Sequence, residues 1–197
     1  MENLQAYWTK RYEEGRTGWN IGYPSTPIKE YFDQLENKDV NILIPGAGNA
    51  YEAEYLFQQG FQHVHVLDIA RPPLDAFQER VPDFPADQLL HGDFFSHEAT
   101  YDIIVEQTFF CALEPKPVRR KQYAAQMHRL LKTNGKLVGL LFKHPLDLTR
   151  GRPFGGSLTE YQSYFEEVFD MIYLENCYNS IPPRMGNEYF MMMRKRS

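Results

Sequence analysis

The stretch from Asn41 to Asp68 restricts the possible folds more than any other part of the chain. It opens with the apolar run Ile42-Leu43-Ile44, which is bounded by turn residues and is typical of a strand buried on both faces. Gly46 and Gly48 follow. Because glycine lacks a Cβ, the backbone there can adopt positive φ and come close to a ligand. Residues 51–59 have the composition of a helix that begins at this turn.

A second buried strand, residues 64–67, ends in Asp68, twenty positions after Gly48. In doubly wound folds an acid about 20 residues on accepts hydrogen bonds from ribose hydroxyls. A dinucleotide fingerprint requires a third glycine where this chain has Tyr51, which argues against NAD. No Gly-Lys-Ser/Thr follows the turn either, so the phosphate and magnesium groups of a P-loop are missing. The stretch therefore predicts a nucleoside without phosphate, and S-adenosylmethionine is the common one.

Length and charge narrow the class of protein. We expect residues 1–197 to form one domain, since this length is enough for a full core. The net charge of -5, with a single basic run at 194–196, argues against a nucleic-acid partner. The longest apolar stretches, such as 137–142, are far shorter than the ~20 residues of a membrane helix. With only Cys111 and Cys177 as thiols and no leader-like N-terminus, we expect a cytoplasmic monomer.

Residues 1–36 are interpreted as a helical N-terminal cover that precedes the first strand. A helical stripe ends at Gly15, and a second helix starts at Ser25. The connection between them is rich in aromatic residues, which indicates a loop that covers a site. For Trp8 and Trp19 two interpretations stay open at this point: closing over a ligand, or packing the first helix on the core.

The rest of the chain alternates between strands and helices and ends in a hairpin, which predicts a mostly parallel sheet. Residues 144–156 have no periodicity and are predicted to form a loop over the ligand-binding edge. The predicted helices are 71–80, 117–131 and 158–169, and the predicted strands are 88–91, 101–105, 136–142, 171–177 and 189–193.

Two acidic residues follow predicted strands at this edge. Asp93, after the third strand, can accept from an adenine amino group while Phe94 stacks on the ring; the alternative is a turn cap. Glu106, after the fourth strand, either acts on the substrate, caps a helix or pairs with an arginine. Cys111 is interpreted as a buried, inert thiol. His63 and His65 alternate onto one face of a strand, but no third ligand is near and no metal is expected.

Several motifs, in this order and spacing, resemble the thiopurine methyltransferase-like family, and within it the halide and thiol methyltransferases. The likeness covers nearly the whole chain. It implies a class I methyltransferase fold: a Rossmann-like, seven-stranded, mostly parallel sheet with a reversed last strand and an N-terminal cover. The motifs are Pro45-Gly46-Ala47-Gly48, Asp93-Phe94-Phe95, the stretch from Glu106 to Leu113, and Ile181-Pro182-Pro183-Arg184.

The resemblance also implies roles for individual residues around S-adenosylmethionine, whose product is S-adenosylhomocysteine. Trp8 and Trp19 would contact the methionine part and Asp68 the ribose. Asp93 and Phe94 would contact the adenine. The full predicted cofactor set is Trp8, Trp19, Pro45, Gly46, Gly48, Asp68, Ile69, Asp93, Phe94 and Gln107.

The implied reaction is methyl transfer to a small sulfur or halide nucleophile such as a thiol, hydrosulfide, thiocyanate or halide. In-line displacement needs alignment and exclusion of water more than a strong base. Arg152 and Arg184 are candidates to favour a thiolate, with Glu106 as a third pocket candidate. Three alternatives stay open: the same fold acting on a thiopurine-like heterocycle or on a tellurium or selenium oxyanion, a non-catalytic sensor that binds S-adenosylmethionine, and the disfavoured NAD oxidoreductase.

Overall fold

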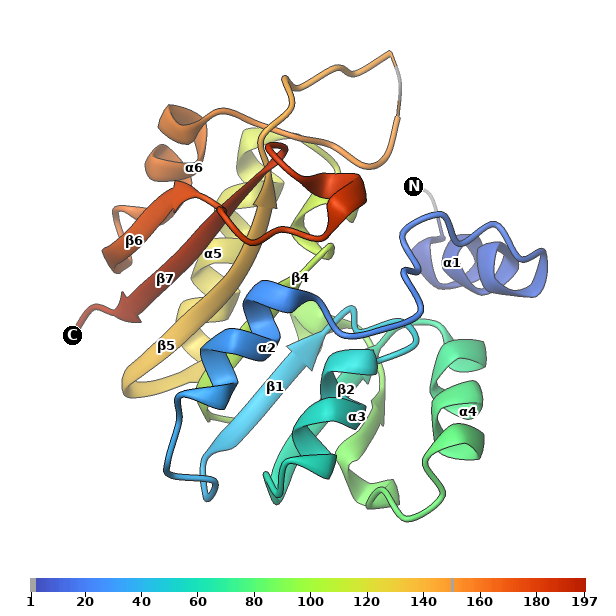
Figure 1. Cartoon of the computed structure of the whole chain (residues 1–197). Helices are drawn as coiled ribbons and strands as arrows, with labels where there is room; N and C mark the ends of the chain where they lie inside the picture. Colours follow the sequence, from blue (N-terminus) through green and yellow to red (C-terminus); the bar gives the residue numbers. More distant parts are fainter. Residues whose placement is uncertain (1–2, 150) are drawn as a thin grey trace.

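The computed structural model describes residues 3–149 and 151–197, and within them seven strands form one sheet in the order β3-β2-β1-β4-β5-β7-β6 (Figure 1). Strands β1 to β5 pair in parallel, whereas β7 runs antiparallel to both β5 and β6. The predicted seven-stranded sheet with a reversed last strand is therefore confirmed. The strands are β1 (Asn41–Pro45), β2 (His63–Asp68), β3 (Leu89–His91), β4 (Tyr101–Gln107), β5 (Leu131–Phe142), β6 (Phe169–Asn176) and β7 (Glu188–Lys195).

Helices cover both faces of the sheet. The central strands are therefore buried on both sides, which explains their continuous apolar sequences. Helices α2 to α4 pack on one face in one hydrophobic cluster, and α5 and α6 pack on the other face in a second cluster. None of the helices in the described residues is long and apolar enough to cross a membrane. The helices are α1 (Leu4–Glu13), α2 (Thr26–Asp33), α3 (Tyr51–Gln58), α4 (Arg71–Arg80), α5 (Pro117–Leu130) and α6 (Leu158–Phe165), with short 3-10 turns η1 (Ala86–Gln88), η2 (Phe94–Ser96), η3 (Phe110–Ala112) and η4 (Pro182–Arg184).

The largest differences from the predicted element boundaries are at the start of β5 and the end of α6. Strand β5 begins directly after α5, at Leu131. Its pairing with β4 is interrupted between the pairs Tyr101–Leu131 and Ile103–Lys136, and residues 132–135 lie in this interruption. Asn134, at φ 63, allows the chain to turn there. Helix α6 ends at Phe165, and Phe169 is already the first residue of β6.

The N-terminal cover lies beside the end of the sheet toward which the parallel strands point. Helix α1 packs against α4 and contributes no buried residue (Figure 1). The ends of the parallel strands and the loops after them form the ligand-binding edge of a doubly wound sheet. Most of the predicted site residues lie at this edge.

Candidate functional site

The turn between β1 and α3 contains two glycines in the left-handed region, Gly46 at φ 60 and Gly48 at φ 54. Its conformation is fixed by Asp68 at the end of β2. Asp68 Oδ2 accepts from the Gly48 N–H at 2.8 Å, and Oδ1 accepts from the Ala70 N–H at 2.8 Å. Burial raises the pKa of Asp68, while these N–H groups act in the opposite direction. Because each oxygen has two lone pairs, each retains one beyond the backbone bond.

Tyr12 lies directly against this turn, which the sequence did not indicate. A Cβ on Gly48 would be 2.6 Å from the Tyr12 hydroxyl oxygen. Trp19 Nε1 donates to the same hydroxyl at 3.2 Å. Burial raises the pKa of Tyr12, and the nearby Asp68 carboxylate raises it further. In the sequence, Tyr12 follows Trp8 by four residues on one predicted helix and matches the N-terminal cover of the resembled family.

The two tryptophans contact each other in the N-terminal cover. The ring centroids of Trp8 and Trp19 are 5.3 Å apart in an edge-to-face arrangement. Both are half-buried, and neither belongs to a hydrophobic core cluster. Both rings therefore lie outside the two core clusters, and their contact with the cofactor stays a prediction.

Phe109 closes the other side of the glycine turn. A Cβ on Gly46 would overlap the Phe109 ring, so the close approach of ring and backbone requires glycine. Phe109 follows Thr108, which adopts φ 58. The loop after β4 thus reaches the loop after β1 by way of this side chain.

Phe94 is buried in the core, whereas Asp93 is exposed after β3, where its contact with adenine stays a prediction. The Phe94 side chain is 4% exposed and packs edge-to-face on Phe95 and Phe109, so its stacking on adenine is corrected to a core position. Asp93 is exposed, and its Oδ1 accepts from the Phe95 N–H at 3.1 Å, which is the turn cap of the alternative interpretation.

Glu106 is fully buried at the end of β4, and both of its oxygens are bound. Oε1 accepts from the Phe109 N–H at 2.8 Å and the Phe110 N–H at 2.9 Å, and Oε2 accepts from the Tyr123 hydroxyl. Burial raises the pKa of Glu106 to about 7. The carboxylate is therefore a cap of the following turn, and its predicted place in the substrate pocket is corrected.

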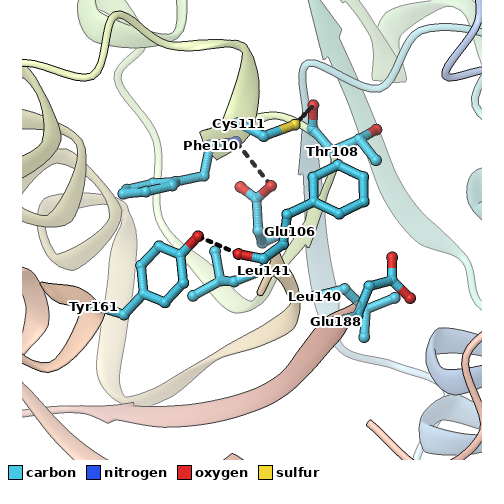
Figure 2. Close-up of a pocket in the computed structure, with 9 residues that line it drawn as sticks. Glu106, Thr108, Phe110, Cys111, Leu140, Leu141, Tyr161 and Glu188 are labelled. Carbon is cyan, nitrogen blue, oxygen red and sulfur yellow. Dashed lines mark hydrogen bonds between the residues drawn. The ribbon is translucent and has the colours of Figure 1, made fainter. Parts of the chain in front are cut away.

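A small cavity of about 10 Å³ lies beside Glu106, between β4, β5 and α6 (Figure 2). This volume corresponds to about one water molecule. Cys111 lines it, with its Sγ 3.2 Å from the Thr108 carbonyl oxygen. Burial raises the pKa of Cys111, which agrees with an inert thiol.

A much larger cavity of about 660 Å³ contains both predicted arginines. Arg184 is 8% exposed, and its Nη1 lies 3.5 Å from Glu188 Oε1. Arg152 donates from Nε to the Ala112 carbonyl oxygen at 2.7 Å. Two guanidinium groups thus line this cavity, together with the carboxylate of Asp147. Its lining residues are Phe142, His144, Pro145, Asp147, Gly151, Arg152, Pro153, Pro183, Arg184 and Asn187.

The remaining predicted residues lie near the same edge. Pro45 is buried at the end of β1, and Ile69 is half-buried directly after Asp68. Gln107 Oε1 is 3.4 Å from the Ser25 hydroxyl, which donates to it instead of capping α2. This bond joins the N-terminal cover to the end of β4.

The two strand histidines have separate partners. His63 Nε2 lies 3.0 Å from Asp39 Oδ1, and His65 Nδ1 lies 3.3 Å from the Ile42 carbonyl oxygen. Among residues 3–149 and 151–197, no group of three or more potential ligands is arranged to hold a metal ion.

Comparisons with known proteins agree with this geometry. The family model of thiopurine S-methyltransferase matches residues 4–195. A probable thiol methyltransferase 2 of Arabidopsis thaliana is 30% identical over 203 residues, which covers 100% of this chain and 88% of that protein. Thiocyanate methyltransferase 1 of Brassica oleracea is 27% identical over 188 residues, covering 92% and 81% of the two chains.

A solved structure has the same fold. The 1,6-didemethyltoxoflavin-N1-methyltransferase of Burkholderia thailandensis, crystallised with its substrate and S-adenosylhomocysteine, superposes with a TM-score of 0.77. The two sequences are 17% identical, and the match covers 98% of this chain and 88% of that one. This likeness shows a shared architecture.

Proposed function

Because the chain belongs to the thiopurine S-methyltransferase family and is an S-adenosylmethionine-dependent methyltransferase, we propose that it methylates a small sulfur nucleophile. The acceptor class is a thiol, hydrosulfide or thiocyanate, with halides as a related group. The observation that carries the proposal is the pair of guanidinium groups, Arg152 and Arg184, in one cavity beside the N-terminal cover. The names of the thiol and thiocyanate methyltransferase relatives support the same acceptors.

The residues around the glycine turn fit the cofactor. The left-handed backbone at Gly48 and the close approach of Tyr12 leave no room for a Cβ, so this position requires glycine. Asp68 retains one lone pair on each oxygen for ribose hydroxyls. We propose that Gly46, Gly48, Asp68 and the two tryptophans hold the cofactor, and that Tyr12 joins this set.

When bound, S-adenosylmethionine supplies a methyl group activated on a sulfonium. The protein's part is to align the acceptor and exclude water, which the half-buried rings of Trp8, Trp19 and Tyr12 in the cover would do. Arg152 and Arg184 would lower the pKa of a bound thiol from its usual value of about 8.5 and so raise the thiolate fraction. Glu106 is not the base, because both of its oxygens accept hydrogen bonds within the fold.

The size of the large cavity favours a second candidate for the methyl acceptor. At about 660 Å³ it falls within the range of sites for drug-sized ligands and is larger than hydrosulfide requires. A thiopurine-like heterocycle would use this space. We also propose that residues 1–197 act as one domain, since one sheet extends from Asn41 to Lys195. We propose that the protein is a monomer, which size-exclusion chromatography tests.

The acceptor class is tested by incubating the purified protein with S-adenosylmethionine and a panel of acceptors while measuring S-adenosylhomocysteine. The panel contains hydrosulfide, thiocyanate, iodide, an aromatic thiol and a thiopurine. We expect turnover with the sulfur nucleophiles, and an Arg152→Gln variant should raise the KM of the anionic acceptors. Turnover with none of the sulfur acceptors in the panel would refute the proposal.

A further inference from the structure

Both arginines of the large cavity also contact the N-terminal cover. Arg184 Nη2 donates to the Trp19 carbonyl oxygen at 3.0 Å. The guanidinium carbon of Arg152 lies 4.9 Å from the centroid of the Tyr7 ring and 5.7 Å from that of Trp8. Residues of the N-terminal cover therefore contact both the Arg152 and the Arg184 guanidinium groups.

The same segment reaches the glycine turn on its other side. Trp19 Nε1 donates to the Tyr12 hydroxyl at 3.2 Å, and that hydroxyl lies against Gly48. The contacts Arg184 to Trp19, Trp19 to Tyr12 and Tyr12 to Gly48 form a continuous path. This path connects the large cavity with the residues proposed to hold the cofactor.

The part of the cover before α2, residues 3–24, has no buried side chain to fix its position. Helix α1 contributes no buried residue, and Trp8 and Trp19 are only half-buried. Segments with few buried groups open at a lower free energy than the core. A charge-assisted hydrogen bond from a nearly buried guanidinium therefore has a large influence on where Trp19 lies.

We propose that Arg184 is a positioning residue that couples the acceptor cavity to the cofactor site through the backbone of Trp19. This inference rests on the proposed function, because it takes the cavity as the acceptor site. Arg184 Nη1 forms an ion pair with Glu188, which is 2% exposed, at 3.5 Å, but this contact does not have hydrogen-bond geometry, and Nη1 has no other acceptor among the described residues. An anion in the cavity would meet this guanidinium while its Nη2 holds Trp19.

The direction of the coupling follows from the shared segment. Both ligands require an ordered cover, so the ligand that binds first lowers the ordering cost for the second. Linkage requires that the effect be reciprocal: an acceptor anion tightens the cofactor by the same factor as the cofactor tightens the anion. The acceptor therefore binds best to the complex of enzyme and cofactor.

The test is calorimetric titration of S-adenosylhomocysteine into the full chain, with and without thiocyanate at constant ionic strength. S-adenosylhomocysteine carries no transferable methyl group, so the ternary complex does not react. We expect Arg184→Gln to raise the Kd of S-adenosylhomocysteine about tenfold or more without any acceptor. Arg194→Gln, a matched change of an exposed arginine on β7, should stay within twofold.

In the wild-type protein, thiocyanate should lower the Kd of S-adenosylhomocysteine at least threefold, and this effect should vanish in Arg184→Gln. Arg184→Lys should recover part of the affinity, because an ammonium can still donate to the Trp19 carbonyl. Arg184→Gln leaves the buried Glu188 unpaired, which can prevent folding. In that case the Arg184→Gln/Glu188→Gln double variant, which lacks both charges, is used in the same titrations. The two tryptophans of the chain both lie in the cover, so their fluorescence reports the cover alone.

An unchanged Kd in folded Arg184→Gln, or no effect of thiocyanate on the wild-type Kd, would overturn the coupling. These outcomes are distinguishable from a failure of the proposed function. If S-adenosylhomocysteine binds and sulfur acceptors are methylated while the variant binds normally, only the coupling is refuted. If no sulfur acceptor is methylated at all, the proposed function is refuted.

Discussion

The hydroxyl of Tyr123 donates a hydrogen bond to Glu106 Oε2, and both side chains are completely shielded from solvent. Glu106 also accepts from the backbone of Phe109 and Phe110. The pair therefore holds the turn in which Thr108 adopts φ 58 and Phe109 lies against Gly46. Glu106, which was predicted to lie in the substrate pocket, thus stabilises the loop that contacts the glycine turn.

The buried carboxyl of Glu106 should make stability depend on pH. Its pKa is raised to about 7 from 4.5, so its contribution to stability is complete below about pH 4.5 and is lost as the pH rises through 7. Relative to Glu106→Gln, the wild type should lose about 3 kcal/mol of unfolding free energy between pH 4.5 and pH 8. Urea unfolding of both proteins across this range measures the difference. A constant difference between them would contradict the buried titration.

Two histidines should make the protein less stable as the pH falls, which is the opposite pH dependence from that of Glu106. The His65 ring packs on Tyr101 at 5.3 Å, and His97 Nε2 lies 2.7 Å from the Tyr101 hydroxyl. Burial lowers the pKa of both histidines below 6.5. Their contribution is present above pH 6.5 and is lost as the pH falls through the folded-state pKa. His65→Gln should therefore reduce the acid sensitivity of thermal unfolding, and an unchanged pH profile would count against this assignment.

Asp68 should be required for cofactor binding if it holds the ribose. Asp68→Asn keeps the shape of the side chain but replaces one acceptor oxygen with a donor. We expect the affinity for S-adenosylhomocysteine to fall by about 1–3 kcal/mol, measured by calorimetry. Normal affinity in a folded variant would remove Asp68 from the site.

The glycine turn allows a matched pair of substitutions. Gly48→Ala forces a Cβ against the Tyr12 hydroxyl, in addition to the strain of φ 54. Gly60→Ala has a comparable strain at φ 87 but meets no atom within 4 Å. Both should lose about 1–2 kcal/mol of stability, and only Gly48→Ala should also weaken cofactor binding strongly. Equal affinity in the two variants would show that contact between Tyr12 and the turn is unimportant.

The sheet could be predicted because its signals are local. The buried run at β1, the glycine turn and the acid at Asp68 follow one another within 28 residues, and each has a simple physical meaning. The reversed last strand came from a family resemblance rather than from periodicity. The course of residues 132–135 could not be predicted, since it depends on how β4 and β5 pair.

The site was harder to predict because it depends on long-range contacts. Tyr12 and Gly48 are far apart in sequence, and no local pattern indicates that a phenol lies on the turn. The loop that contains Phe94 was predicted at the correct edge, but the direction of the Phe94 side chain was not, because core packing decides it. Arg152 and Arg184 were predicted to share a role, but they are far apart in the sequence and only the fold brings them to one cavity.

The central claim is transfer of a methyl group from S-adenosylmethionine to sulfur. The most direct test is to follow a labelled methyl group from S-adenosylmethionine during incubation with hydrosulfide, thiocyanate or an aromatic thiol, and to identify the methylated product. The account predicts an S-methylated product formed one-to-one with S-adenosylhomocysteine. Binding of S-adenosylhomocysteine without release of label to any sulfur acceptor would contradict it and favour a sensor that only binds the nucleoside.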